Sequence, residues 1–148
     1  MGDLKTQIAD ATKVAMKARA KQRVAALRLV NSEIQRLEID ERKALSDDDV
    51  IGVLNRMLKQ RNDSLRQFKD AGRTDLADQE QFEIDLIRTF MPEPLSEAEL
   101  DALVESTIAA VGASSMQDMG KVMGQLKAET HGRADMGSLS AKVKAKLA

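Results

Sequence analysis

Apolar residues recur along this chain at spacings of three and four, with polar residues between them. The first such stripe contains Leu4, Ile8, Ala11 and Ala15. This spacing places side chains on one face of an α-helix, whereas a half-buried strand would alternate apolar and polar residues. Aromatic residues, which favour strands, make up only 2% of the sequence. The pattern therefore predicts an all-α protein.

The sequence before Pro92 divides into about four helices. A bend is expected within the basic, small-residue stretch 17–23, and the polar segment 40–45 separates the next two helices. Ser46 and Asp49 have the spacing of a capping box, which predicts that a long helix begins there. That helix is expected to end at Gly72, and the next one to begin at Thr74 or Asp75.

Pro92 and Pro94 mark the clearest boundary in the chain, because proline stops a helix and keeps the residue before it extended. We therefore expect an N-terminal helical domain, residues 1–91, and a C-terminal domain, residues 95–148, built as a small three-helix bundle. Three serines are predicted to cap the helices of this bundle. They are Ser96 with Glu99, Ser115 with Asp118, and Ser138.

The net charge of −1 conceals an uneven distribution of charged residues. Residues 11–32 contain six basic side chains and no acidic one, whereas residues 75–105 contain ten acidic side chains opposed only by Arg88. Uneven charge can indicate an anionic partner, and it can equally mean that a basic helix packs beside an acidic one. The sequence leaves both interpretations open.

Arg61 lies on the apolar side of the long helix, between Leu58 and Leu65. A charge buried there without a partner would be costly, so a carboxylate from another element should meet it. The following helix offers Glu80 and Glu83. A structural ion pair is one interpretation of this set, and a functional guanidinium is the other.

Composition limits the chemistry that the chain can perform. It contains no cysteine and one histidine, His131, so thiol chemistry and a multi-histidine metal site are excluded. There is no phosphate-binding loop after a strand and no serine in a nucleophile elbow. No apolar run reaches the length of a membrane span, and the N-terminal residues lack the apolar core of a signal peptide. We therefore expect a cytoplasmic protein with no catalytic residue, cofactor or metal of its own.

The segment 118–146 combines glycines with cations. Gly120 and Gly124 lie one turn apart within a predicted helix, where each glycine costs about 1 kcal/mol relative to alanine, and Gly132 is expected to stop that helix. Such glycines suggest close approach of another helix or of a bound backbone. The basic side chains of the segment could contact phosphates, or could be ordinary surface. These RNA-binding candidates are Lys121, Lys127, Arg133, Lys142 and Lys146.

Several motifs in order resemble the YqeY-like family, over essentially the whole chain. They occupy residues 59–64, 72–77, 90–96, 112–115, 118–124 and 132–135. The resemblance implies four N-terminal helices and a three-helix tail similar to the C-terminal part of the GatB subunit of glutamine-dependent aspartyl/glutamyl-tRNA amidotransferase. In that enzyme the tail helps to hold the tRNA, and a separate domain performs the chemistry. The sequence departs from the family pattern after Asp135, where residues 136–138 lengthen the turn before the last helix.

Three functional hypotheses follow from the residues and the resemblance together. The first is a noncatalytic module that associates with tRNA or aminoacyl-tRNA. The second is a protein–protein adaptor that receives a partner helix on the face of Gly120 and Gly124. The third is an accessory subunit in transamidation, since the family carries the label of carbon–nitrogen ligase with glutamine as amido donor. Amidotransferase subunits are accordingly candidate partners, and neither a membrane nor DNA is expected as one.

Overall fold

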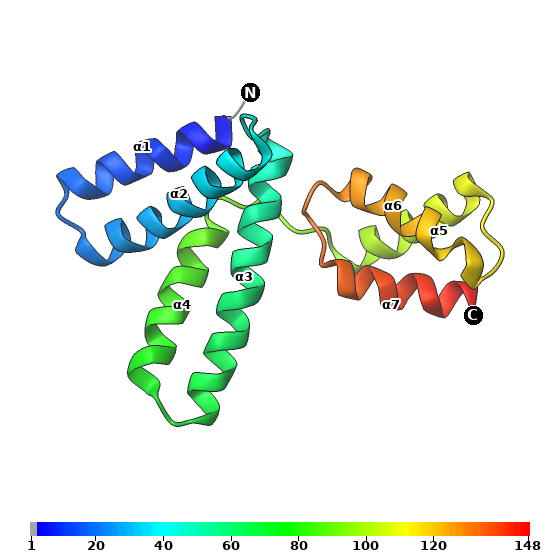
Figure 1. Ribbon diagram of the computed structural model, residues 1–148. Helices are drawn as coiled ribbons and strands as arrows, with labels where there is room; N and C mark the ends of the chain where they lie inside the picture. The colour runs from blue at the N-terminus through cyan, green and yellow to red at the C-terminus, as the bar shows by residue number, and fades with distance from the viewer. Residues whose placement is uncertain (1–2) are drawn as a thin grey trace. The chain divides into compact units, whose positions relative to one another are not determined.

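The computed structural model describes residues 3–148, and every regular element within that range is a helix (Figure 1). The predicted all-α class is therefore confirmed. The chain forms two compact units that divide between Met91 and Pro92. The N-terminal unit contains α1 (Asp3–Lys17), α2 (Lys21–Glu41), α3 (Asp47–Asp70) and α4 (Thr74–Arg88).

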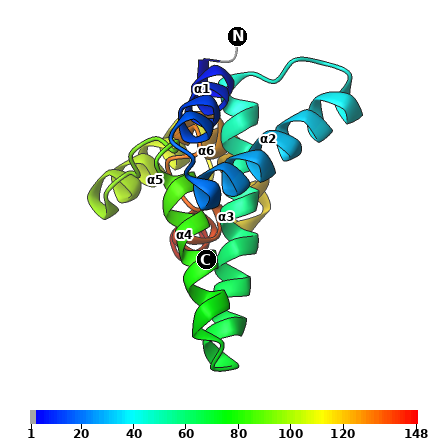
Figure 2. The ribbon, with the colours of Figure 1, turned by 90° about the vertical axis from the view of Figure 1, so that its left-hand side faces the viewer.

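The N-terminal unit is built from two antiparallel helix pairs. Helices α1 and α2 run side by side, and they cross the pair formed by α3 and α4 (Figures 1 and 2). A single apolar core fills the crossing, and its largest side chains, such as Ile8, Leu27 and Leu54, are fully buried. The helical stripes read from the sequence are thus the faces that meet in this core.

Local signals fix the ends of these helices. The expected capping box at the start of α3 is present: the Ser46 side chain accepts a hydrogen bond from the Asp49 amide, and the Asp49 carboxylate accepts one from the Ser46 amide. Gly72 follows α3 with φ of 71°, a left-handed conformation that glycine adopts without strain. The expected bend within residues 17–23 separates α1 from α2.

The C-terminal unit contains α5 (Glu97–Val111), the short 3₁₀ helix η1 (Met116–Asp118), α6 (Met119–Thr130) and α7 (Met136–Leu147). Its core is separate from that of the N-terminal unit. Val122 and Leu126 of α6 are buried there together with Leu139 and Val143 of α7. Each helix of this unit therefore contributes one face to a small bundle (Figure 1).

Of the three capping predictions for this unit, the one at Ser96 is confirmed, because Ser96 and Glu99 form a reciprocal capping box. The prediction at Ser115 is wrong. Residues 116–118 form the 3₁₀ turn, and the Asp118 carboxylate accepts a hydrogen bond from the Ser114 amide at 3.0 Å. A serine three residues before an aspartate does not by itself show which of the two caps the helix.

The start of α7 also differs from its prediction. Asp135 is the N-cap, and its carboxylate accepts hydrogen bonds from both the amide and the hydroxyl of Ser138. Residues 136–138, expected to lengthen a turn, form the first turn of the helix instead. An aspartate at the N-cap satisfies an otherwise unpaired amide and favours this earlier start.

Candidate functional site

The outer face of α6 carries the two glycines that the sequence singled out. Gly120 and Gly124 are exposed, and a Cβ built on either one would meet no atom within 4 Å. Packing within the C-terminal unit therefore does not explain them. At 3.6 residues per turn, Ala128 continues the same line. The face is a narrow strip of small side chains opposite the buried side of the helix.

Lysines border this strip on both sides. Lys121 and Lys127 are exposed, and neither forms an ion pair with any residue in the range 3–148. The charge of Lys121 contributes to a lowered pKa of Asp118, although the larger cause is the hydrogen bond from the Ser114 amide. Two cations are thus available beside an uncovered backbone. We call the surface of Gly120, Lys121, Gly124, Lys127 and Ala128 the α6 face.

Lys142 and Lys146, two further RNA-binding candidates, lie on α7 and pair with acidic side chains of α5. The Nζ atom of Lys142 is 2.7 Å from Asp101 Oδ1 and 2.8 Å from Glu97 Oε2, and that of Lys146 is 2.9 Å from Glu105 Oε1. These contacts raise the pKa of both lysines, mainly through the hydrogen bonds to Asp101 and to Glu105. The pairs hold α5 and α7 together, so a phosphate would have to displace a carboxylate at either lysine.

Arg133, the remaining candidate, fastens the segment that precedes α5. Its Nε atom donates a hydrogen bond to the Glu93 carbonyl at 2.7 Å, and its own carbonyl accepts one from the Leu95 amide at 2.9 Å. His131 and Gly132 make this approach possible, because both adopt left-handed conformations, with φ of 47° and 78°, directly after α6 ends at Thr130. Arg133 therefore has a structural role within the C-terminal unit.

The structure brings Arg61, Glu80 and Glu83 together between α3 and α4. Arg61 Nε lies 3.1 Å from Glu83 Oε2, and Nη1 lies 3.6 Å from Glu80 Oε2. These contacts are ion pairs and not well-aligned hydrogen bonds. The buried atoms Arg61 Nε, Glu80 Oε2 and Glu83 Oε2 each lack a hydrogen-bond partner. Burial raises the pKa of Glu83, against the opposing effect of Arg61. The cluster sits beside the core of the N-terminal unit.

A groove of about 490 Å³ passes beside this cluster, between the start of α2 and α4. Phe82 and Glu83 lie at it, and Lys21 on α2 faces Asp75 and Asp78 on α4 without forming an ion pair. Sequence analysis did not anticipate this groove, because it depends on the crossing of two helices that are distant in sequence. Because both basic and acidic side chains line the groove, its charge does not favour one class of ligand.

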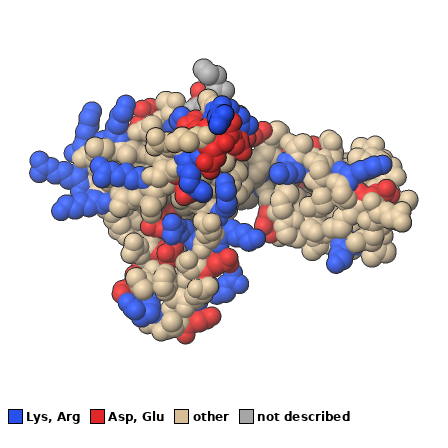
Figure 3. Space-filling view, viewed as in Figure 1, with Lys and Arg blue, Asp and Glu red and all other residues tan. Residues whose placement is uncertain are grey.

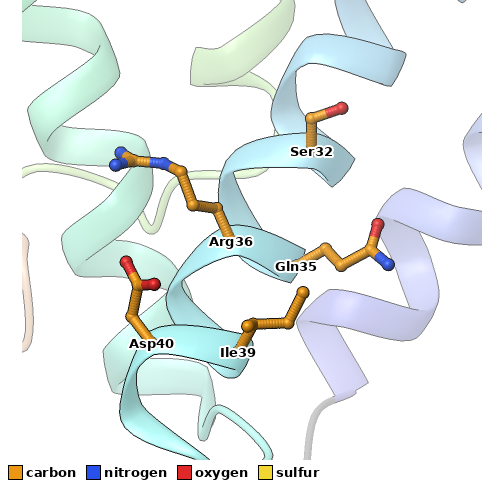
Figure 4. A pocket seen from close by; sticks show the side chains of 5 residues that line it. All are labelled: Ser32, Gln35, Arg36, Ile39 and Asp40. Atoms are coloured by element: carbon orange, nitrogen blue, oxygen red, sulfur yellow. The ribbon is translucent and has the colours of Figure 1, made fainter.

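A second depression, of about 240 Å³, lies on α2 alone. Ser32, Gln35, Arg36, Ile39 and Asp40 line it, and Figure 4 shows all five side chains extending from successive turns of that one helix. No second element closes it. Among residues 3–148, moreover, no group of three His, Asp or Glu side chains is arranged to hold a metal ion. The α6 face is thus the candidate site that the described geometry distinguishes best.

Two units of packed helices, each with its own core, define an all-α protein. The chain belongs to the YqeY family: the family model, described as Yqey-like protein, matches residues 5–147. None of the helices in the described range has both the length and the apolar character that crossing a membrane requires.

Fungal proteins are among the relatives of this chain. An uncharacterized protein of Schizosaccharomyces pombe is 36% identical over 55% of this chain and 66% of its own length. Proteins named altered inheritance of mitochondria protein 41, mitochondrial, are 26% identical in Pyrenophora tritici-repentis and 32% identical in Lachancea thermotolerans. These two matches cover 82% and 70% of this chain and 68% and 57% of the relatives. The chain therefore spans part of each relative.

Replacing Gly120 and Gly124 by alanine is expected to stabilise the C-terminal unit. Both sites are exposed and open, so alanine should gain about 0.5–1 kcal/mol at Gly124 in the helix interior, and less at Gly120, the second residue of α6. Chemical denaturation followed by circular dichroism measures this change. Gly112→Ala is the control and should destabilise the unit, because Gly112 has φ of 68°. A loss of stability in Gly120→Ala/Gly124→Ala would show that the glycines are needed for folding.

Proposed function

We propose that this member of the YqeY family is a noncatalytic module that associates with tRNA through the α6 face. The observation that carries the proposal is the pair of uncovered glycines, Gly120 and Gly124, bordered by two lysines without ion pairs. Gly124 lies in the interior of α6, where glycine weakens a helix, and Gly120 is the second residue of α6. No side chain in the unit fills the space beside either one. An approaching ligand backbone would use that space, and the lysines would contact its negative charge.

A folded RNA fits these features better than a single strand. Proteins that read single-stranded RNA stack its bases on aromatic side chains. The three aromatic residues of this chain, Phe68, Phe82 and Phe90, are all partly buried in the N-terminal unit. Lysines instead make phosphate contacts that position a nucleic acid without reading its sequence. The α6 face would therefore bind RNA by backbone and shape, as the resemblance to the amidotransferase tail implies for tRNA.

The double variant Lys121→Gln/Lys127→Gln tests this proposal in a titration of the full chain with bulk tRNA at two salt concentrations. Each lost phosphate contact should reduce the slope of log affinity against log salt by about 1. The matched control is Lys59→Gln/Lys69→Gln, which removes the same charge from the exposed side of α3. An unchanged slope in Lys121→Gln/Lys127→Gln would show that the α6 face does not contact the tRNA. Absence of binding by the unmodified chain at low salt would remove the tRNA function itself.

A protein adaptor is the second candidate, favoured by the one-turn spacing of Gly120 and Gly124 on an open face. A partner helix can approach closely where side chains are small. Gly120→Leu/Gly124→Leu separates the two candidates. Loss of a co-purifying protein with tRNA affinity retained would favour the adaptor, whereas loss of tRNA affinity in a folded variant would favour the RNA module.

The cellular location of the protein is also part of the proposal. We propose that the chain acts in the cytoplasm, where tRNA is abundant. The word mitochondrial in the names of the two fungal relatives describes those proteins. Fractionation of cells that produce the tagged chain distinguishes the two locations.

A further inference from the structure

A second cationic surface lies on the N-terminal unit, where α1 meets α2. Blue side chains gather at this end of the helix pair in Figure 3, at the same end as the α1–α2 turn of Figure 1. The stretch 11–32 supplies six cations and no carboxylate. We call this surface the basic elbow. Its members are Lys13, Lys17, Arg19, Lys21, Arg23 and Arg28.

None of the cations of the basic elbow forms an ion pair within the described part of the chain. Arg23 is half-buried and the other five are exposed. Elsewhere, acidic side chains do meet bases: Lys5 Nζ is 2.7 Å from Glu38 Oε1, and the acidic segment 75–105 pairs with Arg61 and with the lysines of α7. Lys21 does line a groove with Asp75 and Asp78 of the acidic helix α4, but it forms no ion pair there, so the acidic helix does not neutralise the elbow.

Folding does not explain the charges at the start of α2 either. The N-cap of α2 is Ala20, which makes no side-chain cap, and the first turn holds no acidic residue. Lys21 and Arg23 instead place positive charge beside the positive end of the helix dipole, an arrangement that costs stability. These two cations therefore oppose the charge preference of the helix that carries them.

The apolar residues near the elbow argue against a lipid surface. A helix that lies on a bilayer presents one continuous apolar face. In α1 that face is already buried, with Ile8 0% and Ala15 2% exposed. The exposed large apolar side chains of stretch 11–32 are Val14 and Met16 on α1 and Leu29 on α2. Val14 and Met16 are two residues apart, so they point to nearly opposite sides of α1 and cannot enter a membrane together. Only Leu29 could accompany either one, whereas six cations share the stretch.

We propose that the basic elbow binds the phosphate backbone of a folded RNA, as a contact surface separate from the α6 face; this inference rests on the proposed tRNA association. Its cations are distributed over two antiparallel helices and their turn, as an extended polyanion requires. The arginines among them can donate paired hydrogen bonds to one phosphate. No aromatic residue lies within stretch 11–32, so the elbow contacts backbone and leaves the bases unread.

The triple variant Lys13→Gln/Lys17→Gln/Lys21→Gln tests the elbow in the full chain, with bulk tRNA as the probe. We expect tRNA affinity to fall at least about tenfold at 0.1 M salt and the salt slope to become shallower by about 2–3. Its matched control, Arg56→Gln/Lys59→Gln/Lys69→Gln on α3, should stay within about twofold of the unmodified chain. The thermal midpoint of the elbow variant should stay close to that of the unmodified chain, because the loss of Lys21 relieves the dipole of α2 while the loss of Lys17 removes a favourable cation from the last turn of α1.

The outcomes separate this inference from the proposed function. If the unmodified chain binds tRNA and the elbow variant binds it equally well, the elbow is overturned while the tRNA association stands. If the unmodified chain does not bind tRNA at low salt, the proposed function fails and the elbow fails with it. Loss of binding to phosphatidylserine vesicles in the elbow variant, with tRNA affinity unchanged, would assign the surface to a membrane instead and overturn the inference.

Discussion

Replacing Leu126 by alanine is expected to unfold the C-terminal unit while the N-terminal unit keeps its structure. Leu126 is 0% exposed at the centre of the core that α5, α6 and α7 share. Truncating a buried leucine to alanine costs about 2–5 kcal/mol. A bundle of three short helices has little stability to lose. The cores of the two units are separate, so the loss should not spread beyond Pro92.

Hydrogen exchange read by mass spectrometry is the suitable measurement, because the chain contains neither Trp nor Tyr as a fluorescent probe. Amide protection should disappear over residues 92–148 of the Leu126→Ala variant and persist in α1 to α4. Leu126→Met is the matched control, since a swap of similar volume costs less than about 1.5 kcal/mol. Simultaneous loss of protection in both units would contradict the division at Met91 and Pro92.

Replacing Arg61 by leucine is expected to destabilise the N-terminal unit by about 3 kcal/mol at neutral pH. The change leaves Glu80 and Glu83 beside the core, with side chains only 13% and 11% exposed and no cation between them. The lower end of the usual range applies because the Arg61 side chain is itself 26% exposed. Removing one carboxylate as well, in Arg61→Leu/Glu83→Gln, should restore part of the stability. Urea denaturation of the three proteins gives the comparison.

The pH dependence of this effect has a definite sign. Burial raises the pKa of Glu83 above its ordinary value of 4.5, so the folded state holds the proton more tightly than the unfolded state. Ionised Glu83 therefore costs stability above its folded pKa, and this cost fades as the pH falls toward 4.5. The penalty of Arg61→Leu should shrink over the same range. A penalty that is constant between neutral pH and pH 4.5, or no rescue by Glu83→Gln, would contradict the ionic account.

Sequence patterns predicted those features of the fold that depend on neighbouring residues. The capping boxes at Ser46 and Ser96 and the left-handed glycine at 72 each follow from chemistry within one turn of helix. The same local rules failed at Ser115 and Ser138. Asp135 takes the amide of Ser138 and caps α7, whereas Asp118 bonds back to the Ser114 amide and no side chain caps η1 or α6. Residue spacing alone does not distinguish these outcomes.

The candidate site was less predictable because it depends on which helix faces meet. The glycines and lysines of segment 118–146 indicated a candidate site. The sequence could not show, however, that Lys142 and Lys146 form ion pairs with acidic side chains of α5. It also could not show that Arg133 reaches back 40 residues to the Glu93 carbonyl. Ion pairs engage Lys142 and Lys146, and a backbone carbonyl engages Arg133, whereas Lys121 and Lys127 lie beside the glycines without an ion pair in the described chain.

The basic elbow is a second case in which the sequence alone does not show how charged side chains pair. Its six cations are obvious in the sequence, yet only the structure shows that no carboxylate of the described chain forms an ion pair with them. Two surfaces, one on each unit, thus carry positive charge that no ion pair within residues 3–148 neutralises. This is the physical basis for proposing a polyanionic partner.

The salt dependence of tRNA binding by the unmodified full chain tests this account most directly. Affinity measured by filter binding between 50 mM and 200 mM salt should fall with a log–log slope steeper than about −4, as expected when the lysines and arginines of both surfaces each replace a counterion at a phosphate. A flat dependence, or no binding at 50 mM salt, would contradict the central claim that this YqeY-family chain associates with tRNA through its unpaired cations.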